Sequence, residues 1–148
     1  MAGHIQTVMN GEYDVLINPP APDILDIGAN VGGFALWALH RWPGCHITCY
    51  EPSASNFHLL EINMDHYSSS VEIHNCAVGN TAYTKLYRGK NNCGEASLYM
   101  GPEQLPDFEE VKTIDPLTLP EAHILKLDVE NSELDILEPL IEAGRSFH

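Results

Sequence analysis

The residues best suited to chemistry in this sequence begin with the segment from Asp26 to Gly32, which reads D-I-G-A-N-V-G. Gly28 permits a sharp turn after an apolar run, and Gly32 lacks a side chain where a ligand or the sheet must approach closely. A helix that begins here directs its partly positive amide end towards an anionic group. The spacing is not the G-x-G-x-x-G of dinucleotide sites, and Asp26 opposes a pyrophosphate. The segment therefore predicts a site for a carboxylate that carries an amino group beside it, with a purely structural turn as the alternative.

A second acid, Glu51, follows Asp26 by 25 positions and ends the next apolar run. In nucleoside-binding α/β sheets, an acid about 20 positions after the glycine turn accepts hydrogen bonds from ribose hydroxyls. Taken alone, Glu51 has an exposed loop acid as its alternative interpretation. Two such features at the ends of consecutive strands favour a ligand with an amino-acid head and a nucleoside sugar, as in S-adenosylmethionine.

Two further acids, Asp128 and Glu130, end a later apolar run. Residues two apart in extended chain point to the same side, so both acids can share one site and orient or deprotonate an acceptor hydroxyl. Asp128 is the stronger candidate for contact with acceptor or cofactor. Alternatively, one of the acids caps a helix at Ser132 or pairs with Lys126. No metal site is predicted, because the further carboxylates that a magnesium ion needs are not identifiable and the eight histidines are dispersed.

The elements that must position these residues alternate along the chain. Apolar, β-branched runs predict strands over 23–28, 46–50, 71–78 and 123–129, whereas helical spacing of apolar residues predicts helices over 31–42 and after Ser53 and Ser132. The helix after Ser53 has the predicted buried residues Phe57, Leu60 and Met64. The last helix ends near Gly144 and has the predicted buried residues Leu134, Leu137, Leu140 and Ile141.

The middle of the chain breaks this alternation. Residues 85–87 and 96–99 flank a turn-rich segment and predict a hairpin or an exposed excursion, and 111–115 predicts a further strand. With this exception, the order predicts an α/β fold: a doubly wound parallel sheet with helices on both faces. We expect residues 1–22 to form an N-terminal extension and residues 23–148 to form the ligand-binding domain.

Composition limits the possible partners. The 148 residues carry a formal charge of −14, which repels phosphate backbones and anionic lipid surfaces and therefore argues against nucleic-acid and membrane partners. The charge suits a cationic ligand, although solubility alone also accounts for it. Four cysteines without a C-x-x-C pair, and a start without a signal-peptide pattern, predict a cytoplasmic protein with reduced thiols.

Four motifs together resemble the FkbM-type S-adenosylmethionine-dependent methyltransferases: 26–32 (D-I-G-A-N-V-G), 50–52 (Y-E-P), 75–79 (N-C-A-V-G) and 126–130 (K-L-D-V-E). The resemblance implies a Rossmann-like class I methyltransferase fold with S-adenosylmethionine at the carboxyl ends of the strands. It implies that the methionine end is held by 26–32, the ribose by Glu51, and that the backbone around Ala77 borders the adenine. The residues predicted to bind the cofactor are Asp26, Gly28, Ala29, Asn30, Gly32, Glu51, Pro52 and Ala77.

The sequence departs from the family pattern in two places. Asn131 stands where the fourth motif has glycine, and the chain ends before the C-terminal strands of a complete class I fold, so we expect those strands to be lacking or supplied by a partner. The predicted function is O-methylation of a hydroxyl on a sugar or secondary metabolite, by a chain that is a possible homo-oligomer. The alternatives are a non-catalytic S-adenosylmethionine-binding or assembly module and a nucleotide-dependent oxidoreductase.

Overall fold

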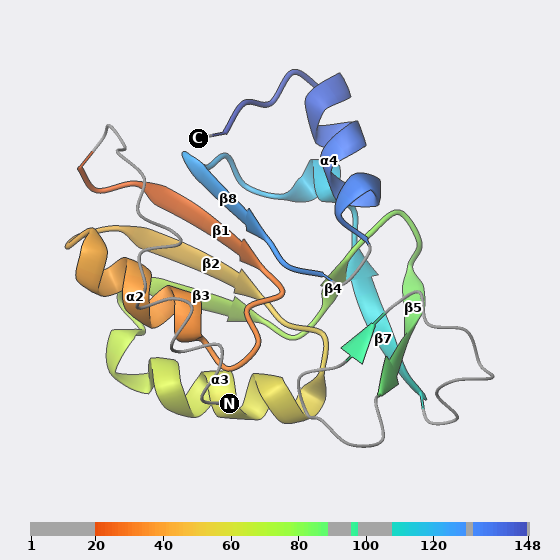
Figure 1. The fold of residues 1–148 in the computed structure, drawn as a ribbon, viewed down its shortest axis with the longest axis horizontal. Helices are drawn as coiled ribbons and strands as arrows, with labels where there is room; N and C mark the ends of the chain where they lie inside the picture. The colour runs from red at the N-terminus through yellow and green to blue at the C-terminus, as the bar shows by residue number, and fades with distance from the viewer. Residues whose placement is uncertain (1–19, 89–95, 98–107, 130–131, 148) are drawn as a thin grey trace.

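A parallel sheet forms the centre of the computed structural model, which describes residues 20–88, 96–97, 108–129 and 132–147. Its strands are β1 (Asp23–Ile27), β2 (His46–Tyr50), β3 (Val71–His74) and β8 (Ile124–Leu127), in the order β3-β2-β1-β8 (Figure 1). Every neighbouring pair is parallel, with Ile24 of β1 opposite Ile47 of β2 and Ile124 of β8. The predicted parallel sheet is confirmed, and it brings the carboxyl ends of the strands to one edge.

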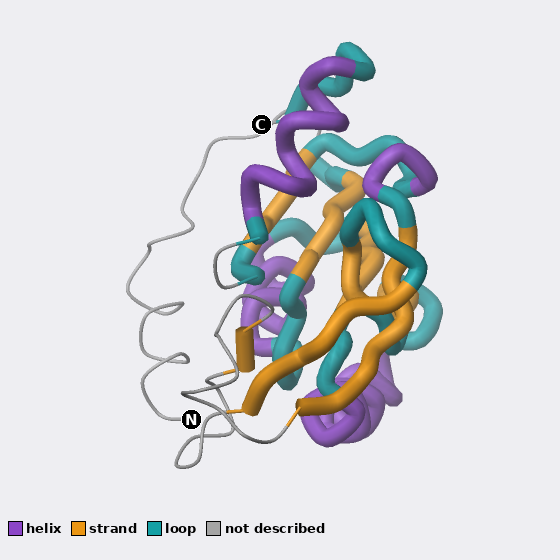
Figure 2. Tube along the Cα trace, turned by 90° about the vertical axis from the view of Figure 1, so that its right-hand side faces the viewer, coloured by secondary structure: helices purple, strands orange, loops and turns teal. Residues whose placement is uncertain are grey.

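Helices cover both faces of this sheet, as predicted. Helices α2 (Gly33–Arg41) and α3 (Ala54–Met64) pack on the face that carries Ile24 and Ile47, and a 3-10 turn, η1 (Asp65–Tyr67), follows α3. Helix α4 (Glu133–Glu142) packs on the opposite face, which carries Leu25 and Ile27, together with the 3-10 turn η2 (Pro116–Thr118). Figure 2 shows α4 at the top and α3 at the bottom, with the strands between them. Successive residues of β1 therefore enter different cores, as the pleat requires.

A second, smaller sheet was not predicted as a separate unit. It has the strand order β4-β7-β5-β6, made of β4 (Ala77–Val78), β7 (Phe108–Ile114), β5 (Tyr83–Arg88) and β6 (Ala96–Ser97). The antiparallel pairing of β5 with β6 confirms the predicted hairpin in part, since residues 98–99 lie outside the described residues. Strand β7 corresponds to the further strand predicted at 111–115.

The prediction of one strand over 71–78 is wrong. The chain leaves the main sheet after His74 and enters the second sheet at Ala77, where β4 pairs with β7 in parallel. Asn75 lies at the junction, and its side-chain amide donates to the carbonyl oxygens of Glu51 and Pro52 at 2.9 and 3.2 Å. Val71 at the start of the segment and Ala77 and Val78 at its end are all buried, but in two different sheets.

The buried face of α4 also differs from the prediction. Ile136 and Leu140 are fully buried, whereas Leu134 and Ile141 are 68% and 64% exposed. Ile136 and Leu140 lie one helical turn apart and pack on the core around Leu25 and Ile27, which turns the other two side chains outward. Gly144, with φ 77°, follows the helix as predicted, while neither Ser53 nor Ser132 makes a side-chain cap hydrogen bond.

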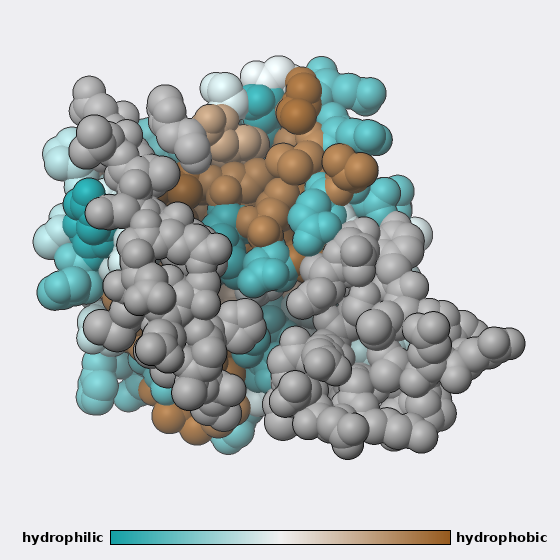
Figure 3. Space-filling model, viewed as in Figure 1, coloured by the Kyte–Doolittle hydropathy of each residue, from teal (hydrophilic) through white to brown (hydrophobic). Residues whose placement is uncertain are grey.

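Apolar side chains gather over α4 and β8 on the face seen in Figure 3. They include the exposed Leu134 and Ile141 of α4 and the partly buried Leu125 and Leu127 of β8. Among the described strands, β8 pairs with β1 alone and forms an edge of the main sheet. No helix in the described ranges has the length and apolar character needed to cross a membrane.

Candidate functional site

The candidate site lies where β1, β2 and β8 end side by side. The backbone N–H groups of Gly28 and Ala29 donate to the Tyr50 carbonyl oxygen at 2.9 and 3.0 Å, which joins the turn after β1 to the end of β2. On the other side, the Asp128 N–H donates to the Ile27 carbonyl oxygen at 3.1 Å. Three segments that are distant in sequence therefore meet at this edge of the sheet.

The glycines of the turn are required by packing within the protein. Gly28 and Gly32 have φ values of 80° and 88°, which L side chains rarely adopt. A Cβ on Gly28 would overlap the Asp128 carbonyl oxygen, and one on Gly32 would lie 2.9 Å from Leu60 and 2.8 Å from Met64 of α3. The close neighbour of Gly32 in the structure is therefore helix α3. The cofactor contacts of Gly28 and Gly32 stay predictions.

Asn30 and Gly33 also belong to this turn, and they differ from Gly28 and Gly32. Asn30 adopts a left-handed backbone with φ 53°, and a Cβ on Gly33 would meet open space. The Asn63 side-chain amide of α3 donates to the Val31 carbonyl oxygen at 2.7 Å, so α3 is hydrogen-bonded to the turn. Among the described residues, no atom therefore adjoins a side chain placed at the first residue of α2, where the helix presents its amino end.

Glu51 links the turn to the start of α3. Its Oε2 accepts the Asn30 N–H at 2.8 Å and its Oε1 accepts the Ser53 N–H at 2.9 Å, and the side chain is only 5% exposed. Burial raises the pKa of Glu51, although these two N–H groups and the Asn56 side chain oppose the rise. Ser53 thus contributes its backbone rather than a side-chain cap. A carboxylate has about four lone-pair positions, so Glu51 retains capacity for further donors.

Asp26 is fully buried and lies next to a buried lysine. Lys126 Nζ is 3.0 Å from Asp26 Oδ1 and donates to the Gly28 carbonyl oxygen at 2.7 Å. Desolvation raises the pKa of Asp26, and the positive charge of Lys126 opposes this rise. Asp26 Oδ2 is buried without a hydrogen-bond partner among the described residues. The acid predicted to face the methionine end therefore already has an ammonium group beside it.

The other residues predicted for the site differ in their burial and in their location. Asp128, with a half-exposed side chain, has Oδ2 3.9 Å from Lys126 Nζ, so the pairing with Lys126 that the sequence left open involves Asp128. Glu130 lies outside the described residues. Ala29 is buried in the core under α2, and Ala77 is buried in the second sheet with Leu86 and Val111. Pro52 is partly buried in the loop after Glu51.

Lys126, Asn75 and Asn63 contribute to the site although the sequence did not predict them as site residues. A signal existed for Lys126, because a single lysine inside an apolar strand requires a buried partner. Asn75 belongs to one of the quoted motifs, but its bonds to Glu51 and Pro52 join segments more than 20 positions apart. For Asn63 no signal was available, since a polar residue on a helix is ordinarily exposed to solvent.

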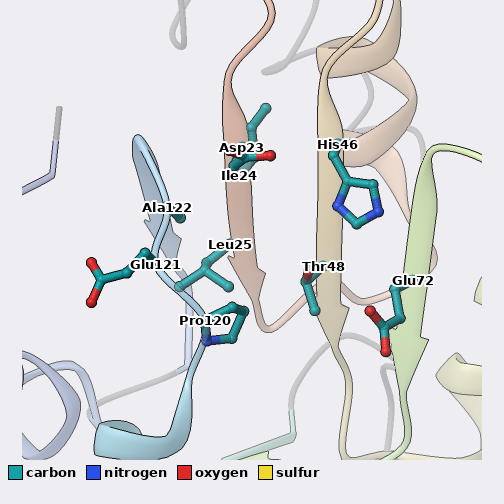
Figure 4. A pocket seen from close by; sticks show the side chains of 9 residues that line it. All are labelled: Asp23, Ile24, Leu25, His46, Thr48, Glu72, Pro120, Glu121 and Ala122. Carbon is teal, nitrogen blue, oxygen red and sulfur yellow. The ribbon is translucent and has the colours of Figure 1, made fainter.

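A pocket of about 300 Å³ lies at the opposite end of the strands (Figure 4). It is lined by the first residues of β1 and β2, by Glu72 of β3 and by residues 120–122. Two of its acids are paired with histidines: Asp23 with His123 at 3.4 Å and Glu72 with His74 at 3.1 Å. Ligands of open α/β sheets bind beyond the carboxyl ends of the strands, so this pocket is separate from the candidate site.

The geometry agrees with the result of a family comparison. The family model described as the methyltransferase FkbM domain matches residues 26–147, which include all three strand ends. The chain belongs to the methyltransferase FkbM domain family. This FkbM domain is 26% identical to Methyltransferase 1 of Beauveria bassiana over 93% of the chain, and 26% identical to Methyltransferase sdnD of Sordaria araneosa over 88%. It spans 66% and 64% of the lengths of these two relatives.

A solved structure shows the same fold. The chain superposes on the FkbM methyltransferase from Methylobacillus flagellatus KT with a TM-score of 0.59 at 16% sequence identity. The superposition covers 90% of this chain and 34% of that protein. The class I methyltransferase fold expected from the sequence is therefore confirmed, and the sheet order and the two helical layers described above are its core.

Proposed function

We propose that this FkbM domain binds S-adenosylmethionine beyond the ends of β1 and β2 and belongs to an O-methyltransferase for a hydroxyl on a sugar or secondary metabolite. The observation that carries the proposal is the position of Glu51. Its carboxylate is held by the Asn30 and Ser53 N–H groups at the end of the strand next to the glycine turn. A carboxylate fixed there is oriented before a ribose arrives, which lowers the entropy cost of binding.

The residues present fit this cofactor. Beyond the Asn30, Ser53 and Asn56 donors, Glu51 retains a lone-pair position for a ribose hydroxyl, and a Cβ on Gly33 at the amino end of α2 would meet no described atom within 4 Å. The methionine end would lie along Gly28, Ala29, Asn30 and Gly32. The ribose would lie at Glu51 and Pro52, and the adenine near Ala77.

The domain's own residues then have to align the acceptor and manage its proton. S-adenosylmethionine, when bound, supplies a methyl group activated on a sulfonium, so alignment is the main requirement on the protein. Asp128 is the group placed to accept the hydroxyl proton, because its side chain is half exposed and its backbone contacts the Gly28 turn.

Calorimetric titration of the chain with S-adenosylmethionine tests the proposal. We expect binding by the wild type, a loss of at least about tenfold in affinity for Glu51→Ala because a buried acceptor pair is removed, and no binding of NAD. The matched control is Glu110→Ala, which removes an exposed acid of β7 in the second sheet and leaves the affinity unchanged. A wild type that does not bind S-adenosylmethionine, or a Glu51→Ala chain that binds it equally well, would contradict the proposal.

Transfer itself is measured with a panel of hydroxyl-bearing acceptors and labelled methyl groups. We expect label on oxygen in the wild type, and at least about a hundredfold slower transfer with Asp128→Asn, in the range of general-base contributions. Binding without transfer to any member of the panel would instead favour a non-catalytic binding module. An unchanged rate for Asp128→Asn would remove Asp128 from the role of base.

A further inference from the structure

Lys126 is the buried cation of the candidate site, and it contacts three different segments. It belongs to β8, and its side chain is 10% exposed. Its Nζ lies 2.7 Å from the Gly28 carbonyl oxygen, 3.0 Å from Asp26 Oδ1 and 3.9 Å from Asp128 Oδ2. One ammonium group therefore connects the glycine turn, the buried Asp26 of β1 and Asp128, which follows β8.

The surroundings of Asp26 make this connection necessary. Asp26 is 0% exposed, and its register partners are Cys49 on β2 and Lys126 itself on β8. Cys49 is a buried thiol whose pKa burial raises, so it is neutral and brings no positive charge. An isolated carboxylate buried in this way is strongly disfavoured, and a paired one is tolerated when its partner makes further hydrogen bonds. Lys126 meets that condition through the Gly28 carbonyl oxygen.

Burial also limits what Asp26 can do directly. A side chain without exposed surface cannot contact a ligand unless the residues that cover it move. The ammonium of Lys126 already lies 3.0 Å from Oδ1 of Asp26, the acid that the sequence predicted to pair with a methionine ammonium. Asp26 Oδ1 is thus paired from within the protein, while the Gly28 carbonyl oxygen and Asp128 Oδ2 receive the other interactions of Lys126.

We propose that Lys126 is a positioning residue through which Asp26 acts: the pair fixes the Gly28 turn and Asp128, and Asp26 does not contact the cofactor. The inference rests on the proposed function as far as the cofactor is concerned. Asp26 then helps to shape the site, and Glu51 is the acid that contacts the ligand.

Four variants of the full chain test the pair: Lys126→Met, Asp26→Asn, the double variant, and Lys112→Met as a control. Lys112 is an exposed lysine of β7 in the second sheet, so its loss changes the net charge equally without touching the site. Urea unfolding and calorimetric binding of S-adenosylmethionine are measured for each. In affinity, we expect a loss of at least about tenfold for Lys126→Met, because a charge-assisted hydrogen bond to the turn is removed, and a smaller loss for Asp26→Asn.

The double variant separates charge compensation from simple packing. Lys126→Met leaves a buried carboxylate without a partner, so we expect the double variant to be more stable than Lys126→Met alone at pH 7. We also expect the stability of Lys126→Met to rise towards that of the double variant as the pH falls, because protonation removes the charge of Asp26. The charged groups that face Asp26 are Lys126 and Asp128 from β8, with the neutral Cys49 on β2.

Two results would overturn the inference. Equal stability losses for Lys126→Met and the double variant at every pH would show that Lys126 does not compensate Asp26. An affinity loss for Asp26→Asn as large as that for Lys126→Met would show that Asp26 meets the cofactor itself. If the wild type does not bind S-adenosylmethionine, the proposed function fails, while the unfolding measurements still decide whether Lys126 and Asp26 are coupled.

Discussion

The two ends of the main sheet both carry acids, but they hold them differently. At the carboxyl ends, Asp26 and Glu51 are 0% and 5% exposed, and each is bound to groups from another segment. At the amino end of β1 and on β3, Asp23 and Glu72 have side chains that are 57% and 59% exposed and pair with histidines in solvent. Buried acids with fixed partners are costly to build, whereas exposed pairs contribute little.

The difference distinguishes the candidate site from the pocket at the amino ends of the strands. A cavity is present at the amino ends, yet its acids Asp23 and Glu72 are exposed to solvent and already paired with histidines. At the carboxyl ends, acceptors are held in place by backbone N–H groups and by Lys126 before any ligand arrives. Perturbed, buried titratable groups are typical of functional sites, and the two buried acids whose pKa burial raises, Asp26 and Glu51, lie at the carboxyl ends.

The largest effect is expected from Gly28→Ala. The new Cβ would overlap the Asp128 carbonyl oxygen at a φ of 80°, so both strain and overlap oppose the native turn. We expect a loss of about 3 kcal/mol or more in the free energy of unfolding. Gly44→Ala is the control at the amino ends: its φ is 89°, but its Cβ would meet only Ala21, at 3.7 Å, so about 1 kcal/mol is expected. Equal losses in urea unfolding would show that the contact with Asp128 is unimportant.

Glu51 predicts an unusual dependence of stability on pH. Burial raises the pKa of this carboxyl above its ordinary value of 4.5, so the folded chain keeps the proton to a higher pH than the unfolded chain does. The free energy of unfolding therefore falls as the pH rises from 4.5 through the raised pKa. Glu51→Gln removes this contribution, and the advantage of the wild type over the variant should be largest near pH 4.5. Asp26 has a shift in the same direction, which cancels in the difference.

The measurement is urea unfolding of both chains at several pH values between 4.5 and 7.5. Glu121→Gln serves as the control for the loss of one carboxylate, at an 82% exposed side chain that lies 3.5 Å from Arg145. A wild type whose advantage over Glu51→Gln grows with pH would mean that the N–H groups of Asn30 and Ser53 outweigh burial.

Most of the fold could be predicted because the strands of the main sheet correspond to local runs of residues in the sequence. The strand predicted at 46–50 has the observed bounds, since residues 47–50 are buried on both faces of the strand and the β-prone run ends at Glu51-Pro52. The division of 71–78 into β3 and β4 was not predictable from that run. It depends on Asn75, which binds the loop after β2, and on β7, a partner more than 30 positions away.

The site was predictable in its residue types and less so in its interactions. The positions of Gly28 and Glu51 at adjacent strand ends follow from the order of strands and helices, and the structure confirms that these ends meet. The role of Lys126 follows only from the parallel pairing of β8 with β1, which places residues 100 positions apart opposite one another. Which side chains of α4 are buried depends on which side of the helix faces the sheet. The spacing of the leucines alone did not determine that side.

The smallest effect is expected for Glu72→Gln. The carboxylate lies 3.1 Å from His74 Nε2, but both side chains are more than one third exposed, so solvent screens the pair. We expect a loss below about 1 kcal/mol, which disappears in concentrated salt. His74 is left in place because its ring stacks on Tyr50 at 4.9 Å, and removing it would disturb a core contact as well. A larger loss that persists in salt would mean that exposed pairs stabilise this sheet as buried ones do, and the contrast between the two groups of acids would no longer hold.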